Sequence, residues 1–298
     1  MPALYALLDP LWSRMPMPTR GRAREIRIGP LPALEMSRTF RGKPMMRVYS
    51  YAVGDTLVDT GLPGLGDQVL AFARARGARH AILTHHHEDH AGNAGPLAAA
   101  GLDVRATALT GRILESPLPI PFYEHLAWGK PGPARPALLP DSVELLGDRV
   151  EVLPAPGHCV DQVVLWMPAR GWLFAGDVFL HEQVRLFRRD EDFAATIATL
   201  ERLSALPIEA LFCAHRPRID GGAAALRAKL QHLRDIEGRV RTQYARGASV
   251  RRIAADLRLP GSRGLQWLSM GDASTANLVH SILFGPRPRA ELRRLGAV

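Results

Sequence analysis

Apolar runs and helical patterns alternate along the chain up to about residue 220. Short apolar runs that end at turn-forming residues predict buried strands, over Ala23–Ile28, Met46–Ala52, Thr56–Val58, His80–Leu83, Asp103–Ala106, Arg149–Leu153, Gln162–Met167, Trp172–Ala175 and Ala210–Cys213. Apolar residues at spacings of three and four predict helices, over Leu65–Arg76, Ala94–Ala100 and Glu191–Leu203, with Asp190 as the N-cap of the last. This alternation indicates an α/β core.

The pattern changes at three places. Residues 1–23 can hold a short amphipathic helix that ends near Met15-Pro16. Residues 107–148 are rich in proline and bulky side chains, and we expect a helical or looped insertion there. After about residue 220 the apolar spacing is helical throughout, with Ser249 and Ser274 as helix starts. We therefore expect a catalytic domain over residues 1–220 and a helical region over residues 221–298.

Composition narrows the class of protein. The 298 residues are 47% apolar, which is ample for a sizeable core. The net charge is +9, but the basic residues are nearly all arginine and are spread along the chain, so charge alone does not establish nucleic-acid binding. Two cysteines make no disulfide framework, no apolar run is long enough for a membrane span, and the N-terminus lacks a basic signal region. We expect a cytoplasmic protein.

The segment Thr84–His90 concentrates candidate metal ligands directly after the apolar run Ala81–Leu83. It contains four of them, His85, His87, Asp89 and His90. On an extended chain, alternate side chains point the same way, so His85 and His87 can face one point. A turn can direct Asp89 and His90 to a neighbouring point. This arrangement suits two adjacent metal positions, one with imidazoles alone and one with a carboxylate added.

Three further ligand-type residues follow predicted strands. His158 comes after Arg149–Leu153, and Asp177 and His215 come directly after the strands that end at Ala175 and Cys213. Functional residues of α/β sheets gather at strand ends. A single His or Asp after a strand is more often a turn or capping residue, but here three such positions follow the same pattern as the His cluster. Together they predict a complete metal site.

With these residues the chain resembles the metallo-β-lactamase fold superfamily. The matching signs are His85-x-His87-x-Asp89-His90, then His158, Asp177 and His215 in that order, and Val58-Asp59-Thr60-Gly61 upstream. The resemblance covers roughly residues 25 to 220. It implies an α/β fold, a four-layer αββα sandwich with a dinuclear site at one edge, to which the chain adds a helical appendage that is winged-helix-like in some relatives.

The resemblance also implies roles for these residues. His85, His87 and His158 would hold one metal, Asp89, His90 and His215 the other, and Asp177 would bridge them. Asp59 would orient one of these ligands without contacting a metal itself. The expected cofactors are two divalent ions, zinc first, with iron or manganese as alternatives. Cys159 and Ala214 stand where relatives commonly have Thr or Ser and Gly. Neither change removes a ligand, and Cys159 is expected to be a small buried group.

By this resemblance the expected activity is hydrolysis by a metal-bridging hydroxide, with Asp89 and Asp177 as catalytic residues. The glyoxalase II-like branch suggests a small ester, thioester or lactone as substrate. Two alternatives stay open: a phosphodiesterase or nuclease that acts on nucleic acid, and a mononuclear iron dioxygenase relative that handles sulfur compounds. The sequence leaves the natural substrate, the native metal and the oligomeric state open.

Four residues are candidates for substrate contact. Tyr123 and Trp128 of the 107–148 insertion can wall an apolar pocket or pack against the core. His181 and Arg185 follow Asp177 closely and can meet an anionic group, together with Arg188 and Arg189. The alternative for this basic run is a solvated loop in which Arg188 or Arg189 pairs with Asp190, Glu191 or Asp192. The expected partner is a small molecule that can be anionic, with no membrane; nucleic acid is the less favoured alternative and stays open.

Overall fold

The computed structural model describes residues 18–185, 187–257, 259 and 262–296. Seven strands form the first sheet, in the order β1-β2-β3-β4-β5-β6-β7. Their bounds are β1 Thr19–Ile28, β2 Leu31–Phe40, β3 Lys43–Val53, β4 Thr56–Val58, β5 His80–Ile82, β6 Asp103–Ala106 and β7 Ala137–Leu138. Strands β1 to β4 pair antiparallel, and β4 to β7 pair parallel. The N-terminal helix expected to end near Met15-Pro16 lies outside the described residues.

Five strands form the second sheet, in the order β12-β11-β10-β9-β8. Their bounds are β8 Ser142–Leu145, β9 Asp148–Pro154, β10 Val163–Met167, β11 Trp172–Gly176 and β12 Ala210–Cys213. Only β11 and β12 pair parallel among these described strands. Two parallel strands need a connection that crosses back along the sheet. Helix α7, Phe193–Ser204, lies in this connection between β11 and β12. Both strands therefore end at the same edge of the sheet.

The helices complete the element order, with one short 3-10 turn at Pro168–Arg170. They are α2 Gly66–Ala75, α3 Glu88–Ala91, α4 Ala94–Ala99, α5 Ala108–Glu115, α6 Phe122–Ala127, α7 Phe193–Ser204, α8 Gly222–Ala245, α9 Val250–Leu257, α10 Ser262–Leu268, α11 Thr275–Phe284 and α12 Ala290–Arg294. The 107–148 segment thus holds α5 and α6, as expected, and also β7 and β8, which the sequence pattern did not predict. None of the described helices has the length and apolar content that a bilayer crossing requires.

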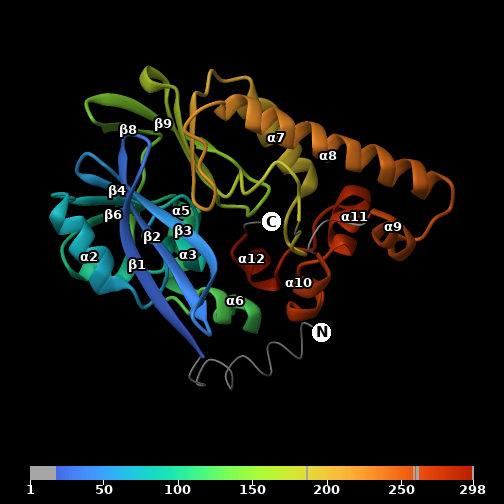
Figure 1. Ribbon diagram of the computed structural model, residues 1–298, viewed down its shortest axis with the longest axis horizontal. Coiled ribbons are helices and arrows are strands. Elements are labelled where there is room, and N and C mark those ends of the chain that lie inside the picture. The colour runs from blue at the N-terminus through green and yellow to red at the C-terminus, as the bar shows by residue number, and fades with distance from the viewer. Residues whose placement is uncertain (1–17, 186, 258, 260–261, 297–298) are drawn as a thin grey trace.

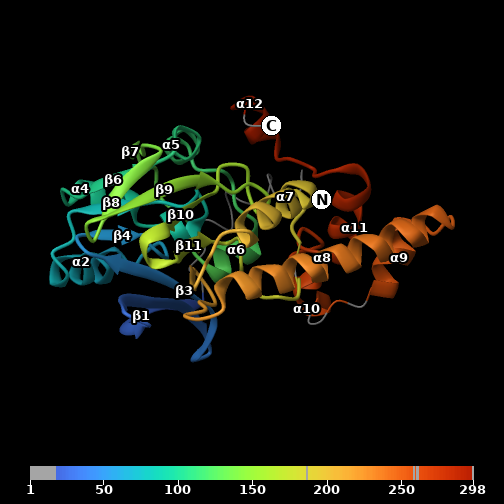
Figure 2. The ribbon, with the colours of Figure 1, turned by 90° about the horizontal axis from the view of Figure 1, so that it is seen from above.

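Three hydrophobic layers separate four layers of secondary structure. Between the sheets lie apolar side chains of both, among them Tyr51, Phe174 and Phe212. The outer face of the first sheet packs against α2 and α4 through residues such as Phe72 and Leu97. The outer face of the second sheet packs against α7 and the C-terminal helices. The expected αββα sandwich is confirmed, and Figures 1 and 2 show helices outside the sheets and α8 to α12 extending to one side.

The C-terminal helices share a core with the second sheet. Leu226, Leu233 and Val240 of α8 belong to the same buried cluster as Leu173 of β11 and Leu200 of α7. The described part of the appendage contains helices only. The division at residue 220 stays a prediction.

One predicted helix cap is wrong. The helix near Asp190 begins at Phe193, and its N-cap is Asp192, whose side chain accepts a hydrogen bond from the Ala195 amide at 3.0 Å. Asp190 instead accepts a hydrogen bond from Arg289 Nε at 2.8 Å. A largely buried guanidinium needs a counter-charge, and this requirement takes Asp190 away from the helix end.

Candidate metal centre

The first group of the centre consists of three histidine nitrogens. The chain leaves β5, bends at Thr84 and His86, is extended at His87 and enters α3. His85 Nε2 lies 2.9 Å from His87 Nδ1, and His158 Nε2 lies 3.0 Å from the same atom. His158 comes from the loop between β9 and β10. Three imidazoles, from segments that follow strands of both sheets, therefore converge on one point, and their role as metal ligands stays a prediction.

The second group lies beside it. His215 Nε2 is 3.2 Å from Asp89 Oδ2, and His90 Nε2 is 3.9 Å from the same oxygen. Asp89 and His90 lie in α3, and His215 follows β12. The ligand-type atoms of these three residues lie within 4.8 Å of one another. One carboxylate and two imidazoles thus form the second group.

Asp177 lies between the two groups, directly after β11. Its Oδ2 is 3.3 Å from His158 Nε2, and its Oδ1 is 3.3 Å from His90 Nε2 and 3.4 Å from His215 Nε2. The residue is 5% exposed. Each oxygen therefore faces a different group, which is the geometry that a bridging ligand requires.

The residues present fit divalent metal ions. His90 Nε2, Asp177 Oδ1 and His215 Nε2 are buried and make no hydrogen bond. Buried polar atoms without a partner are costly and rare, so three such atoms that face each other call for a common partner. Imidazole and carboxylate donors suit zinc, iron and manganese. Cations of this kind would satisfy all three atoms.

Asp59 fixes the orientation of His90. Its Oδ2 is 2.8 Å from His90 Nδ1, and its Oδ1 accepts a hydrogen bond from the Thr84 amide at 2.8 Å. A proton on His90 Nδ1 leaves Nε2 free as a ligand atom. The backbone of Asp59 is left-handed, with φ +61°, a conformation that costs free energy and is retained at functional sites. The position behind the ligands agrees with the expectation from the sequence.

Burial and charge act differently on the two groups. Burial lowers the pKa of His85 and His87 well below its usual value and lowers the pKa of His158 to about 4. Burial also lowers the pKa of His215, but Asp177 and Asp89 outweigh it and raise that pKa to about 10. The negative charge of the centre is therefore concentrated on the second group. Protons and metal ions compete for these atoms.

His86 and Asp161 form a hydrogen-bonded pair that was not predicted from the sequence. His86 Nδ1 lies 2.7 Å from Asp161 Oδ1, and Asp161 Oδ2 accepts hydrogen bonds from the His86 amide at 3.0 Å and from Thr110 Oγ1 at 2.8 Å. The ring of His86 is therefore paired with Asp161, outside both groups. Asp161 lies three residues after His158, and that spacing was the one available signal. Asp161 thus links the segment Thr84–His90 to Thr110 of α5 through hydrogen bonds.

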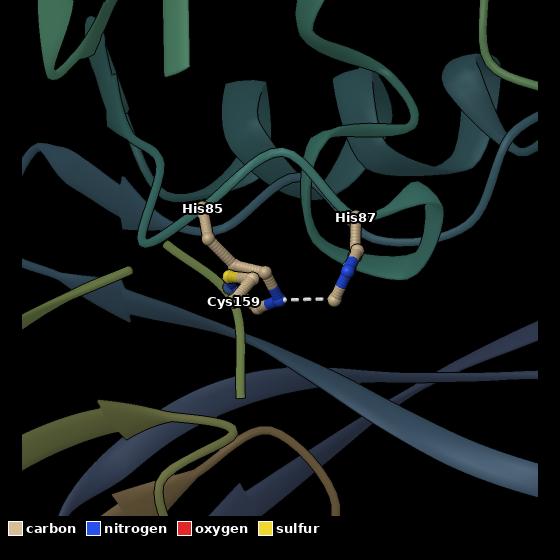
Figure 3. Close-up of side chains that lie close together, drawn as sticks. All are labelled: His85, His87 and Cys159. Atoms are coloured by element: carbon tan, nitrogen blue, oxygen red, sulfur yellow. Dashed lines mark hydrogen bonds between the residues drawn. The ribbon is translucent and has the colours of Figure 1, made fainter. Parts of the chain in front are cut away.

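Cys159 is buried beside the first group. Its Sγ and the ring nitrogens of His85 and His87 lie within 4.8 Å of one another, and Figure 3 shows the three side chains together. Burial raises the pKa of the Cys159 thiol well above its usual value, and Asp161 adds to this shift. A neutral thiol is a poor nucleophile and a poor ligand. This agrees with the expectation of a small buried group.

Arg188 is held by acidic neighbours. Its Nη1 donates to Glu124 Oε1 at 2.9 Å, and its Nε is 3.4 Å from Asp190 Oδ1. Its Nη2 lies 2.7 Å from His87 Nε2. The pairing with Asp190 is one of those weighed from the sequence. The guanidinium is thus engaged by Glu124 and Asp190, and it lies against the ring of His87.

A cavity of about 650 Å³ opens onto the centre. Its walls include metal-centre residues and all four candidate substrate residues, Tyr123, Trp128, His181 and Arg185. The Trp128 ring centroid is 5.7 Å from that of His215. The Tyr123 hydroxyl lies 2.9 Å from Glu124 Oε1 and 2.9 Å from Asp272 Oδ2, and can donate its one proton to either. The residues are therefore brought together at one cavity, and their contact with substrate stays a prediction.

The chain is similar in sequence to a known superfamily and to several of its members. The family model of the metallo-beta-lactamase superfamily matches residues 47–215 of the chain. Hydroxyacylglutathione hydrolase of Alkalilimnicola ehrlichii is 33% identical over 159 residues, which are 51% of this chain and 54% of that protein. The hydrolase of the same name from Rhodobacter capsulatus is 29% identical over 214 residues, 70% of this chain and 74% of that one. The chain spans about half the length of the first of these relatives.

Solved structures show the same fold. A metallo-beta-lactamase from Pontibacter korlensis has a TM-score of 0.57 at 19% identity and covers 72% of this chain and 100% of its own. A metallo-beta-lactamase family protein from Thermus thermophilus has a TM-score of 0.56 at 19% identity and covers 93% of this chain and 94% of its own. The second similarity extends well beyond residues 47–215.

Proposed function

Since the chain belongs to the metallo-beta-lactamase superfamily, we propose that it is a hydrolase that depends on two divalent metal ions. The observation that carries the proposal is the set of buried, unpaired atoms on His90, Asp177 and His215. His85, His87 and His158 would hold the first ion, and Asp89, His90 and His215 the second. Asp177 would contact both, and Asp59 would orient His90.

When bound, such a pair of ions supplies a water activated near neutral pH and an electrophile for the substrate oxygen. The protein supplies the remaining functions. Asp89 has a carboxylate beside His215, 3.2 Å from its Nε2, and can accept a hydrogen bond from the attacking water and orient it. Trp128 covers His215 and limits access of bulk water to that side. Arg188 lies against His87, and Asp161 accepts a hydrogen bond from the His86 amide, so both contact the segment Thr84–His90.

The substrate class follows from the relatives and the cavity together. The curated relatives are named hydroxyacylglutathione hydrolases, and such a name denotes cleavage of a thioester. The cavity beside the centre has the size of a small-molecule site. We therefore propose a small thioester as substrate, with esters and lactones as neighbouring classes, and zinc as the metal.

The test joins metal analysis to a substrate panel. We expect the purified protein to bind about two equivalents of zinc and to hydrolyse acyl thioesters of glutathione or N-acetylcysteamine. A chelator should remove the activity, and added metal should restore it. Hydrolysis that persists after complete metal removal would contradict the proposal. So would a fully loaded protein that turns over no thioester, ester or lactone.

Lys229 offers a prediction from outside the matched region. This residue of α8 is buried, and its Nζ donates to the Val178 carbonyl, next to Asp177, at 2.6 Å. Lys229→Met keeps the bulk and removes the donor. We expect metal affinity to fall about tenfold, the lower end of the loss seen when a partner that orients a ligand is removed. Competition with a chromophoric chelator measures it, and Lys229→Arg should restore part of the affinity. Equal affinities for Lys229→Met and the parent would contradict the role.

A further inference from the structure

The cavity has an apolar wall that begins at the second metal group. Met46 precedes Arg47, whose carbonyl lies 2.6 Å from His215 Nδ1. Trp128 lies over the ring of His215. Leu180 follows Asp177 by three residues and lines the same cavity. Met46, Trp128 and Leu180 therefore give the cavity an apolar surface beside the second metal group.

The C-terminal helical region closes this wall. Leu268 at the end of α10 and Val184 of the loop after β11 line the same cavity. Backbone hydrogen bonds fix the two segments to each other: Arg189 N donates to Asp272 O at 3.0 Å, and Ser274 N donates to Phe187 O at 2.9 Å. Leu268 lies outside residues 47–215, so this part of the wall belongs to the chain's own extension rather than to the matched segment.

Three polar side chains that line the cavity, and are not candidate ligands, are engaged by the protein. The Tyr123 hydroxyl lies 2.9 Å from Asp272 Oδ2, and Arg188 donates to Glu124 at 2.9 Å. Gln162 Nε2 donates to the Ala155 carbonyl at 3.2 Å, and its Oε1 accepts from the Asp177 amide at 3.1 Å. A ligand in this space would have to break such bonds to gain polar contacts, which leaves buried groups unpaired. The apolar side chains offer contact without that cost.

We propose that the cavity binds the acyl part of the substrate and selects an apolar acyl chain of several carbons over a short hydroxyacyl group. The inference rests on the proposed thioesterase function. In the reaction, the oxygen of water bonds to the acyl carbon, the carbon–sulfur bond breaks, the products are a carboxylic acid and a thiol, and one proton of the water passes to the sulfur. The thiol part faces the open rim, where Arg185 and Arg216 are exposed.

A chain-length series tests the proposal on the zinc-loaded protein. The substrates are straight-chain acyl thioesters of N-acetylcysteamine from two to ten carbons. Each methylene that enters the cavity is worth about 0.8 kcal/mol, so kcat/KM should rise up to about fourfold per methylene until the cavity is filled. A kcat/KM that is flat or falls with chain length, while the acetyl thioester is hydrolysed, overturns the proposal.

Binding of the product acids separates this inference from the proposed function. Affinities of acetate, butyrate, hexanoate, octanoate and decanoate are measured by calorimetry. Rising affinity with chain length supports the acyl site even if no thioester is turned over, in which case the thioesterase function alone fails. Affinity that does not rise with length overturns the acyl site, whatever the turnover.

Variants place the effect in the cavity. Leu268→Asp should flatten the chain-length dependence, and Val184→Asp, at a second lining residue, should do the same if Leu268→Asp does not fold. Leu138→Asp is the matched control, because Leu138 of β7 is 68% exposed and does not line the cavity. The control should keep the full slope. Equal slopes in the cavity variants and the control would overturn the assignment of this wall.

Discussion

Asp177→Ala is expected to lower kcat/KM of the metal-loaded enzyme by at least about 1000-fold, which corresponds to about 4 kcal/mol of lost transition-state stabilisation. Its two oxygens face both ligand groups, at 3.3 Å from His158 Nε2 and 3.3 Å from His90 Nε2. Alanine has no atom that could take over either contact. Steady-state kinetics with metal content measured on the same sample gives the result, and circular dichroism shows that the chain stays folded.

His87→Ala should act in the same direction, because His87 Nδ1 is the atom closest to both other rings of its group. The matched control is Asp235→Ala. Asp235 is an exposed carboxylate on α8 that accepts a hydrogen bond from Gln231 of the same helix and does not line the cavity. This control should keep parent activity. Full metal-dependent turnover by Asp177→Ala or His87→Ala would refute the ligand assignment.

Gly92→Ala is expected to destabilise the fold by about 3 kcal/mol or more, as severe overpacking does. A Cβ at Gly92 would lie 2.4 Å from the Glu88 carbonyl oxygen and 2.5 Å from the Gly61 carbonyl oxygen. Both are backbone atoms, and Pro63 closes the third side at 2.4 Å. Relief requires Gly61, three residues after the end of β4, to move away from the ligand-bearing helix α3. Urea unfolding of the metal-free protein measures the loss.

Gly238→Ala is the opposite case and serves as the control. Gly238 lies within α8, and a Cβ there would meet no atom within 4 Å. Alanine should stabilise the helix by about 0.5–1 kcal/mol, because glycine loses more backbone freedom on folding. If Gly92→Ala unfolds at the same urea concentration as the parent, the close approach of α3 to Gly61 is not as tight as described.

The convergence of the candidate ligands could be predicted in part from sequence, because four of the seven lie close together in the chain; metal binding by them stays a prediction. His85, His87, Asp89 and His90 lie within one short segment, and the remaining candidates each follow an apolar strand. Residues that follow strands ending at the same edge of a sandwich lie close together in space. The expected αββα architecture followed from the resemblance, and the order of elements agrees with it.

Features that depend on distant partners were missed. Strand β2 was not predicted, because its buried positions do not alternate strictly with exposed ones. Asp190 looked like a helix cap, and only the approach of Arg289 from the far end of the chain shows its actual partner. The cavity wall combines Met46, Trp128 and Leu268, which no periodicity relates.

The seven candidate ligands come from both halves of the sandwich. His85, His87, Asp89 and His90 follow β5 of the first sheet, whereas the other three follow strands of the second. Bound ions would thus act as a further cross-link between two sheets that also meet through side-chain packing and through backbone hydrogen bonds such as that from Tyr49 N to Ala214 O. Ions that bind only the folded state stabilise it by mass action, and here they would also resist separation of the halves. Metal supply would then govern the lifetime of the protein as well as its activity.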